Sequence, residues 1–207
     1  MRQIELPREK EIDTAGEKVK SVYFPADCLI SLTQDTLDGH SSQVSVVGHE
    51  GLVNIAIIMG ADSTPSRAVV VSAGTAYRLP TTDLKREFEN DAAVRMLLLR
   101  YFQAVITQVA HNAVCNRHHA IDQQLCRWLL LSLDRLPTNE LTMTQESIAN
   151  MLGVRRESVT EAAGRLQKLG IIRYHRGRIT VLDRPRLEAL CCECYTVVKK
   201  EADRLVA

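Results

Sequence analysis

The sequence predicts an α+β protein in which a β-rich N-terminal part precedes a long helix and a second, helix-rich part. Three observations carry this prediction. Short Val- and Tyr-rich segments separated by turn residues continue to about residue 82, helical spacing of apolar residues begins at Asp83, and two short helical patterns broken at Gly153 precede two further strands. The 207 residues suffice for one large domain or two small ones, and 45% apolar with 25% charged residues is typical of a globular chain.

The N-terminal segments have the length and composition of β-strands. The clearest are SVYF (21–24), QVSVV (43–47), AVVV (68–71) and AYRL (76–79). Turn signals separate them, among them Pro25, Gly48, Gly74 and Pro80. Many short strands at such spacing predict a sandwich or a barrel.

Residues 83–117 are expected to form one long helix with two apolar stripes. The first stripe steps by three and four residues through Leu99, Phe102, Ile106, Val109 and Ala113. The second stripe contains Leu98, Tyr101 and Val105. Two stripes need two surfaces to cover them, so one can pack on the sheet while the other meets the same helix of a second copy. A helix buried wholly within one subunit is the alternative.

A second helix is expected from about His118 to Leu136, ended by Pro137, with residues 137–140 as a linker. The next helix is expected over Gln145 to Leu152, with Thr144 as its N-cap. Met143 and Ile148 stand where a hydrophobic staple closes a helix start. Gly153 suits the left-handed residue that ends such a helix.

The last helical pattern begins near Arg155. Its expected buried residues are Val159, Ala162, Ala163, Leu166 and Leu169. Together with Ala149 and Gly153 this spacing is typical of a helix-turn-helix. The segment IIRYHRGRITVL (171–182) then predicts a two-stranded hairpin with a basic tip. A helical hairpin inside an unrelated core is the alternative to the helix-turn-helix. It explains the apolar spacing and Gly153 but not the basic hairpin or the adjacent arginines.

Positive charge gathers in this part of the chain and indicates a nucleic-acid partner. Residues 142–182 contain seven Lys and Arg against three Asp and Glu, whereas residues 1–141 contain 14 against 17. The expected base-reading residues at the start of the second helix are Arg156, Glu157, Thr160 and Glu161. The expected contacts to DNA phosphates are Thr144, Arg155, Lys168, His175, Arg176 and Arg178.

The run TQESIANMLGVRRESVTEAAGRLQKLGIIRYHRGRITVLD resembles the Crp-Fnr family of bacterial transcription regulators, as do VYFPADCLISL (22–32) and GHEGLV (48–53). The resemblance implies a sensory β-roll of the cyclic-nucleotide-binding type (1–82), a dimerisation helix (83–117) and a winged helix-turn-helix domain with a C-terminal helix (118–207). It implies a homodimer on a pseudo-palindromic operator of double-stranded DNA, with RNA polymerase as a downstream partner. The dimer contacts would come from Leu98, Leu99, Tyr101, Phe102, Val105, Ile106 and Val109.

The resemblance also implies an effector or redox signal in the β-roll, whose cofactor the sequence does not name. The run SRAVVV (66–71) keeps the Arg that binds phosphate in cyclic-nucleotide-binding members, which makes Arg67 and the upstream acid Glu50 the candidate effector residues. The Gly-Glu run of those members is absent about ten residues before Arg67, so Arg67 is expected to pair with Asp62. Iron–sulfur members have cysteines near the N-terminus, where this chain has none before Cys28. At the start of the second helix of the helix-turn-helix, Arg155 stands where members of the family usually have a Ser or Thr N-cap.

The thiols and histidines are interpreted as reduced, packed residues of a cytoplasmic protein, with no metal site. The weak metal candidates are His111, Cys115 and His118, whose line on one helix an expected break at Asn116-Arg117 interrupts. Cys191, Cys192 and Cys194 do not converge if they lie on a continuous helix. A regulator that senses metal or oxidant through these residues remains the alternative.

A catalytic role is disfavoured. His40 and His49 do not complete a metal-binding set, and no Ser-His-Asp order, Walker loop or G-x-G-x-x-G run occurs. No catalytic residue is therefore assigned. No apolar run approaches the ~20 residues that span a bilayer, so no membrane partner is expected. A jelly-roll protein that binds a small molecule without acting on DNA is the remaining alternative.

Overall fold

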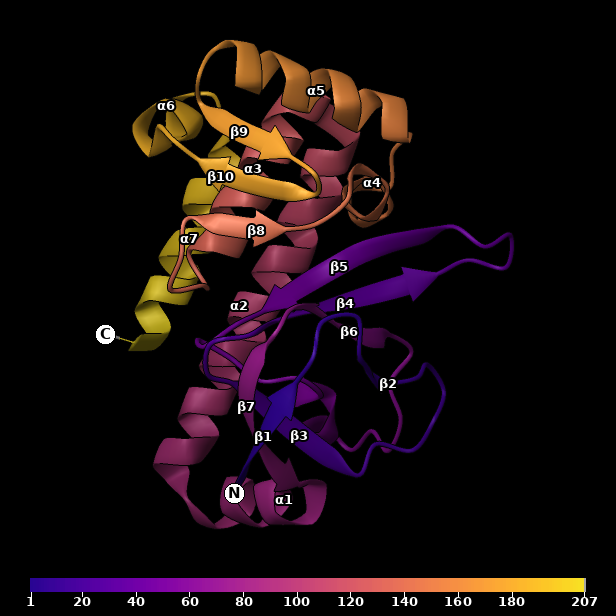
Figure 1. The fold of residues 1–207 in the computed structure, drawn as a ribbon. Helices are drawn as coiled ribbons and strands as arrows, with labels where there is room; N and C mark the ends of the chain where they lie inside the picture. Colours follow the sequence, from indigo (N-terminus) through magenta and orange to yellow (C-terminus); the bar gives the residue numbers. More distant parts are fainter. Residues whose placement is uncertain (207) are drawn as a thin grey trace.

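The structure, a computed structural model, describes residues 1–206. Its N-terminal part contains two antiparallel sheets (Figure 1). The first has the order β1-β7-β3, with β1 at Arg2–Leu6, β7 at Gly74–Pro80 and β3 at Ser21–Pro25. The second has the order β2-β6-β4-β5, with β2 at Glu11–Asp13, β6 at Arg67–Ser72, β4 at Leu29–Asp35 and β5 at Ser41–Val47. A short 3-10 helix, η1 (Ile55–Met59), follows β5.

Apolar residues that point inward from both sheets form the N-terminal core. Its buried members are Leu6, Cys28, Ile30, Val47, Val53, Ala68, Val70 and Ala76. The four strands expected from Val- and Tyr-rich segments are all present, because alternating apolar side chains can fill the space between two sheets. The strands β4 and β5 project beyond this core as a hairpin that reaches below the C-terminal part (Figure 1).

Two helices occupy the region where one long helix was expected. Helix α1 spans Thr81–Asn90 and α2 spans Ala92–His118. Asp91 between them has an extended backbone, and its carboxylate accepts hydrogen bonds from the amides of Ala93 (2.7 Å) and Val94 (3.2 Å). The expectation of a continuous helix over 83–117 is therefore wrong at its start, because Asp91 caps a new helix. The expected break at Asn116-Arg117 is also wrong, since α2 continues to His118.

The C-terminal part contains five helices and a three-stranded sheet in the order β8-β10-β9 among the described residues. Helix α3 spans Ile121–Leu133, which is shorter than the expected 118–136, and β8 (Glu140–Thr142) replaces part of the expected linker. The remaining elements are α4 (Gln145–Leu152), α5 (Arg156–Lys168), β9 (Ile172–His175), β10 (Arg178–Val181), α6 (Arg184–Ala189) and α7 (Glu193–Val206). None of the helices in residues 1–206 is both long and apolar enough to span a membrane.

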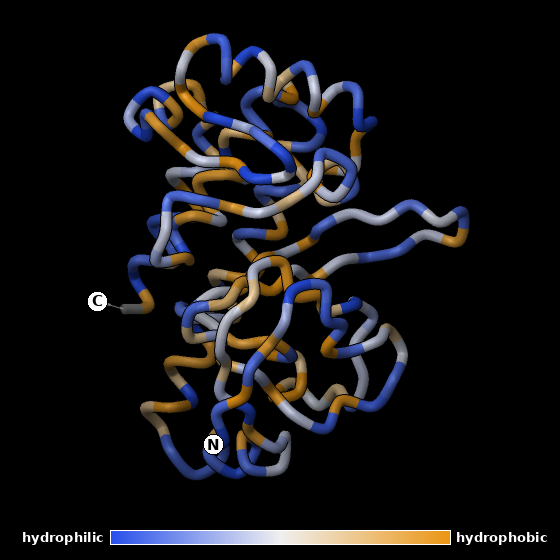
Figure 2. The backbone as a smooth tube through the Cα atoms, viewed as in Figure 1, coloured by the Kyte–Doolittle hydropathy of each residue, from blue (hydrophilic) through white to orange (hydrophobic). Residues whose placement is uncertain are grey.

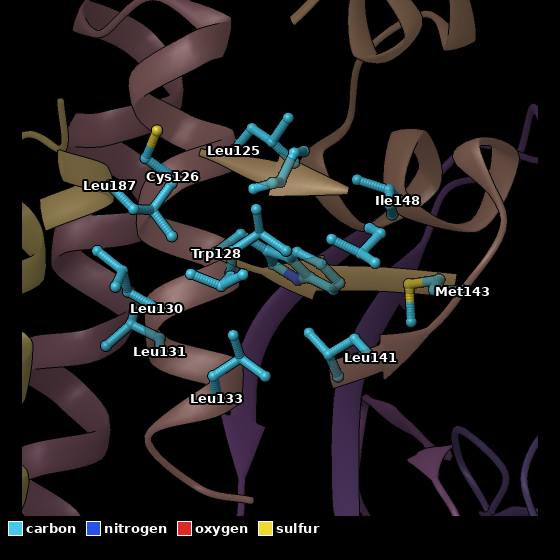
Figure 3. Close-up of a cluster of buried hydrophobic side chains, with 14 of the residues drawn as sticks. Leu125, Cys126, Trp128, Leu130, Leu131, Leu133, Leu141, Met143, Ile148 and Leu187 are labelled. Carbon is cyan, nitrogen blue, oxygen red and sulfur yellow. The ribbon is translucent and has the colours of Figure 1, made fainter. Parts of the chain in front are cut away.

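The two halves of the molecule share one hydrophobic core. Leu29, Val46 and Val71 of the four-stranded sheet belong to the same buried cluster as Trp128 and Leu129 of α3. Figure 3 shows Trp128 at the middle of this cluster, between α3 and the strands. The sheet and the C-terminal helices are thus packed as one body rather than joined by a free linker.

Hydrogen bonds between β5 and the helices α2 and α3 fix the relative position of the two halves. The indole Nε1 of Trp128 donates to Gln43 Oε1 at 3.0 Å. On α2, Asn112 Nδ2 donates to the carbonyl of Val44 at 2.8 Å, and Gln108 Oε1 accepts from Ser45 Oγ at 2.5 Å. Since the three helix side chains are buried, their polar atoms are satisfied only in this relative position of the halves.

A buried ion pair joins the loop after β5 to the end of α3. Arg135 Nε lies 2.5 Å from Glu50 Oε1, and Arg135 Nη1 donates to the carbonyl of Leu131 at 2.7 Å. Gly48 permits this approach, because a Cβ there would lie 2.5 Å from Arg135 Cβ. The loop residues 48–51 therefore dock onto the C-terminal half through a charge pair that solvent screens little.

Replacing Arg135 should destabilise the whole molecule. Arg135→Ala leaves the Glu50 carboxylate buried without its partner, so we expect the free energy of unfolding to fall by about 3–5 kcal/mol. Urea denaturation followed by circular dichroism measures this change. The control is Arg165→Ala, which removes the solvent-exposed pair with Asp122 and should cost less than about 1 kcal/mol. Equal losses in the two variants would contradict a structural role for the buried pair.

Candidate nucleic-acid interface

Helix α4 begins and ends where the sequence predicts. The Thr144 hydroxyl accepts a hydrogen bond from the Ser147 amide at 3.1 Å, which satisfies one donor of the first turn. Met143 and Ile148 are both buried at the helix start. Gly153 ends the helix with φ 66° and ψ 36°, the left-handed conformation that a residue with a Cβ adopts at a cost. The predicted first helix and turn are therefore confirmed.

Helix α5 follows the turn and buries one face. Val159, Ala162, Ala163 and Leu166 are buried as expected. The expectation for Leu169 is wrong, because this residue is the C-cap and is 49% exposed. Ile171 takes the place in the core instead, and its amide donates to the carbonyl of Leu166 at 3.0 Å.

The N-terminus of α5 has no side-chain cap. Arg155 is the N-cap residue and offers no acceptor for the first-turn amides, so these donors and the positive end of the helix dipole face outward. Arg155 and Arg156 are exposed beside them. A helix N-terminus with free amides and two guanidinium groups is suited to bind an anion such as a phosphate.

The four predicted base-reading residues are all exposed, but they differ in their partners. Arg156 and Glu157 form no ion pair within residues 1–206. Thr160 Oγ1 lies 2.7 Å from Gln145 Oε1, and Glu161 faces Arg165 at 3.8 Å. The first two side chains are thus free to meet a ligand, whereas the last two are already engaged.

The hairpin of β9 and β10 forms a wing with a two-residue turn. Arg176 and Gly177 both have positive φ, 48° and 76°, which gives the turn that matches the twist of a hairpin. Arg is unusual in this conformation, which Asn, Asp and Gly favour. His175 and Arg178 flank the turn, and Arg178 Nε lies 3.2 Å from Glu140 Oε1 on β8.

A concave surface connects the helix starts to the wing. It has a volume of about 490 Å³ and is lined by Thr144, Gln145, Glu146, Arg156, Tyr174, Arg176 and Gly177. Burial raises the pKa of Tyr174 to about 12, and its hydroxyl donates to the Met143 carbonyl at 2.8 Å. Gln145 and Tyr174 are not among the site residues predicted from the sequence, because neither belongs to a basic or base-reading pattern. We call this surface the α4–α5–wing groove.

The remaining predicted phosphate residues lie around the groove or away from it. His175, Arg176 and Arg178 line an adjoining depression of about 460 Å³ together with Arg173, which the sequence analysis did not single out. Arg155 faces another depression, of about 700 Å³, between α4, α5 and the loop of the β4–β5 hairpin. Lys168 is in the last turn of α5, about 18 Å of helix rise from Arg156.

The two candidate effector residues are not brought together. Arg67 Nε lies 3.1 Å from Asp35 and Arg67 Nη1 lies 3.8 Å from Glu11, so the expected pairing with Asp62 is wrong. Asp35 competes successfully because β4 and β6 are neighbours in one sheet. Glu50 instead pairs with Arg135, beside a small pocket of about 130 Å³.

The structure does not bring the weak metal candidates together in one site. Cys115 is buried next to His119, Cys192 and Cys194, whereas His118 is exposed. Burial raises the pKa of Cys115 to about 12 and that of Cys194 to about 11. The cysteines near residue 192 do not follow the helical spacing assumed from the sequence, because α7 begins only at Glu193.

Comparison with known proteins identifies the fold. Residues 123–190 match the family described as the Crp-like helix-turn-helix domain. No curated protein matches the chain. Similar solved structures include FixK2 from Bradyrhizobium japonicum (16% identity, TM-score 0.76, covering 92% of this chain and 97% of that one) and a CRP-family transcriptional regulator from Thermus thermophilus (19%, 0.75, 92% and 96%).

The structure of a "putative transcriptional regulator of the crp/fnr family" from Eubacterium rectale is also similar (20% identity, TM-score 0.72, covering 91% of this chain and 88% of that one). The predicted α+β class is confirmed by these structures and by the observed elements. The resemblance to the Crp-Fnr family is confirmed as well: residues 123–190 form a Crp-like helix-turn-helix domain, and the chain as a whole has the fold of the Crp-Fnr transcription regulators.

Proposed function

We propose that the protein is a homodimeric transcription regulator that binds a pseudo-palindromic DNA site through α5 and the wing. The α4–α5–wing groove is the observation that carries this proposal. Arg156 and Arg176 reach it from two different elements, beside the uncapped start of α5. A duplex that places a base edge at Arg156 and a phosphate at Arg176 would use both charges at once.

The contacts can be divided by the chemistry of each side chain. Arg156 offers two donors to the guanine acceptors O6 and N7, and Glu157 can accept from cytosine N4. Thr160 and Glu161 would have to exchange Gln145 and Arg165 for the DNA. The phosphate contacts fall to Arg155, His175, Arg176 and Arg178, whereas Thr144 already caps α4 with its hydroxyl and Lys168 is remote.

The surface of α2 supports a dimer. Leu98 and Tyr101 are buried against the β domain, so the second predicted stripe is used within one copy of the chain. Three residues of the first stripe remain open, with Leu99 45%, Ile106 53% and Val109 40% exposed, whereas Phe102 is partly buried in the same cluster as Leu98. Figure 2 shows apolar residues on the outer edge of the first turns of α2. A twin helix across a two-fold axis would cover this stripe and hold two α5 helices at a fixed separation.

A signal would reach the groove through the β4–β5 hairpin. The hairpin loop borders the same depression as Arg155, and a Cβ on Gly153 would meet Ser42 Oγ at 2.7 Å. An effector or redox change that moves β5 would therefore displace the turn of the helix-turn-helix. RNA polymerase would be the downstream partner, as the family resemblance implies.

Selection of duplexes from a random pool tests the function. The full chain should enrich a pseudo-palindromic sequence at low salt, and gel shift should give tight binding to it. A protein that enriches no sequence and binds no duplex at low ionic strength would contradict the proposal.

The dimer prediction concerns Ile106. Ile106→Glu places an unpaired carboxylate in the open stripe of α2, so we expect dimerisation to weaken by more than about tenfold. Light scattering after size-exclusion chromatography should show a monomer. The control Arg100→Glu adds a carboxylate on another face of the same helix and should leave a dimer. Two variants with the same mass in solution would remove α2 as the interface.

The base-reading prediction concerns Arg156. Arg156→Ala should reduce the preference for the selected operator over a scrambled duplex, at a cost of about 1–3 kcal/mol at that position. The control Arg178→Ala should weaken binding to both duplexes alike and lower the slope of log K against log salt by about one. Fluorescence anisotropy with both duplexes measures the ratio. An unchanged ratio in the Arg156 variant would show that this side chain does not read bases.

The helix-start prediction concerns Arg155. Arg155→Ser supplies the missing cap and removes a charge that opposes the helix dipole, so the free energy of unfolding should rise by about 1 kcal/mol. The same change should weaken DNA binding, because a phosphate contact is lost. Arg155→Ala is the matched control, since it removes the charge without adding an acceptor. If the serine variant is no more stable than the alanine variant, capping does not limit this helix.

A further inference from the structure

Four side chains with metal-binding atoms converge where α2, α3 and α7 meet. Cys115 lies in the last turns of α2 and His119 directly follows that helix, whereas Cys192 and Cys194 flank the first residue of α7. Their three Sγ atoms and one ring nitrogen of His119 all lie within 4.8 Å of one another. We propose that these four residues bind one Zn²⁺ ion as a closed Cys₃His site.

The distances suit a tetrahedral ion. Cys115 Sγ lies 3.6 Å from Cys192 Sγ, and Cys194 Sγ lies 3.8 Å from His119 Nδ1. Zinc–sulfur bonds of about 2.3 Å and zinc–nitrogen bonds of about 2.0 Å, arranged tetrahedrally, give ligand separations of roughly 3.5–3.8 Å. A disulfide between Cys115 and Cys192 would instead need a sulfur separation of about 2.05 Å. The two separations above agree with this range, and all four ligand atoms lie within 4.8 Å of one another.

Glu193 supports the histidine ligand. Its carboxylate lies 3.4 Å from His119 Nε2, on the opposite side of the ring from Cys194. A carboxylate that accepts from one ring nitrogen fixes the tautomer and turns the other nitrogen toward the metal, which is the usual arrangement behind a zinc-bound histidine. Nδ1 is therefore the atom of His119 that would bind the metal. Glu193, which lies between the two ligands Cys192 and Cys194 in the sequence, orients the histidine ring.

A buried cation without a carboxylate partner is the second independent observation. The Arg127 residue on α3 is 4% exposed, hydrogen-bonds Asn112 Oδ1, and leaves its Nε without a partner within residues 1–206. Three thiolates and one Zn²⁺ carry a net charge of −1, so the loaded site would compensate the buried guanidinium.

The site would fix the joint between the long helix and the DNA-binding half. Residues 119 and 120 are the connection from α2 to α3, and α7 packs along α2 (Figure 1). One ion bonded to both sides of this joint would tie α7 to the helix that carries the open apolar stripe. A consequence that rests on the proposed function is that zinc removal should weaken DNA binding.

Metal analysis of the purified full chain tests the site. The protein is prepared from zinc-supplemented cells without chelators and under reductant, then measured by elemental analysis and native mass spectrometry. We expect about one Zn²⁺ per chain, because a closed four-ligand site holds one ion. Replacement by Co²⁺ should give intense thiolate-to-cobalt absorption and a tetrahedral visible spectrum. Both measurements use the unaltered chain, so they do not depend on whether a variant folds.

Matched variants assign the ligands. Cys115→Ala and Cys194→Ala should lose most of the metal, whereas Cys126→Ala, a buried cysteine of α3 outside the four ligands, should retain it. A wild-type chain that binds neither Zn²⁺ nor Co²⁺, or that shows only an internal disulfide, would overturn the proposal. Equal zinc in all three variants would do the same. Zinc bound by a chain that ignores duplex DNA would keep the metal site and refute only the proposed function.

Discussion

The packing of β5 against helices α2, α3 and α4 is the constraint on which the rest of the structure depends. Val46 contributes to the core beneath Trp128, and the polar groups of Gln43, Ser45 and the Val44 carbonyl meet partners on α3 and α2. Most of this buried cluster comes from the C-terminal part, and Leu29, Val46 and Val71 of the sheet extend it across the boundary between the halves. The C-terminal half therefore takes its orientation from a strand of the β domain, and a shift in that strand would also move the helix-turn-helix.

Buried charge makes this arrangement discrete rather than continuously adjustable. The Glu50–Arg135 pair and the close approach at Gly48 allow little sliding, because a small displacement would leave both charges desolvated without a partner. Gly51 adds a second close approach, since a Cβ there would lie 2.2 Å from the Tyr101 ring. A protein built this way would change its conformation by exchanging one set of contacts for another. The four metal-binding side chains would hold the opposite side of the same joint.

Local chemistry decided which parts could be predicted from the sequence. The bounds of α4 and the turn at Gly153 were predictable because a hydroxyl cap and a left-handed glycine act within a few residues. The break at Asp91 was missed because a lone Asp between two helical patterns does not show whether it caps a helix or continues one. The partner of Arg67 depends on which strands are neighbours in the sheet. The convergence of Cys115 with Cys192 depends on the packing of two chain segments that are 77 residues apart. Residue spacing along the chain reveals neither the order of strands in a sheet nor the packing of distant segments.

Two departures from local structural preference lie on neighbouring surfaces. Arg155 lines the depression beside the β4–β5 loop and Arg176 lines the α4–α5–wing groove, and Arg156 lines both. Arg155 occupies an N-cap position where an oxygen would stabilise α5, and Arg176 adopts a positive φ that Asn or Gly would adopt at lower cost. Each costs stability without a compensating contact inside the protein among the described residues. Such departures concentrate at binding sites, where the ligand supplies the compensation. Because both residues are arginines, an anion would supply the compensation, and an extended polyanion could contact both surfaces at once.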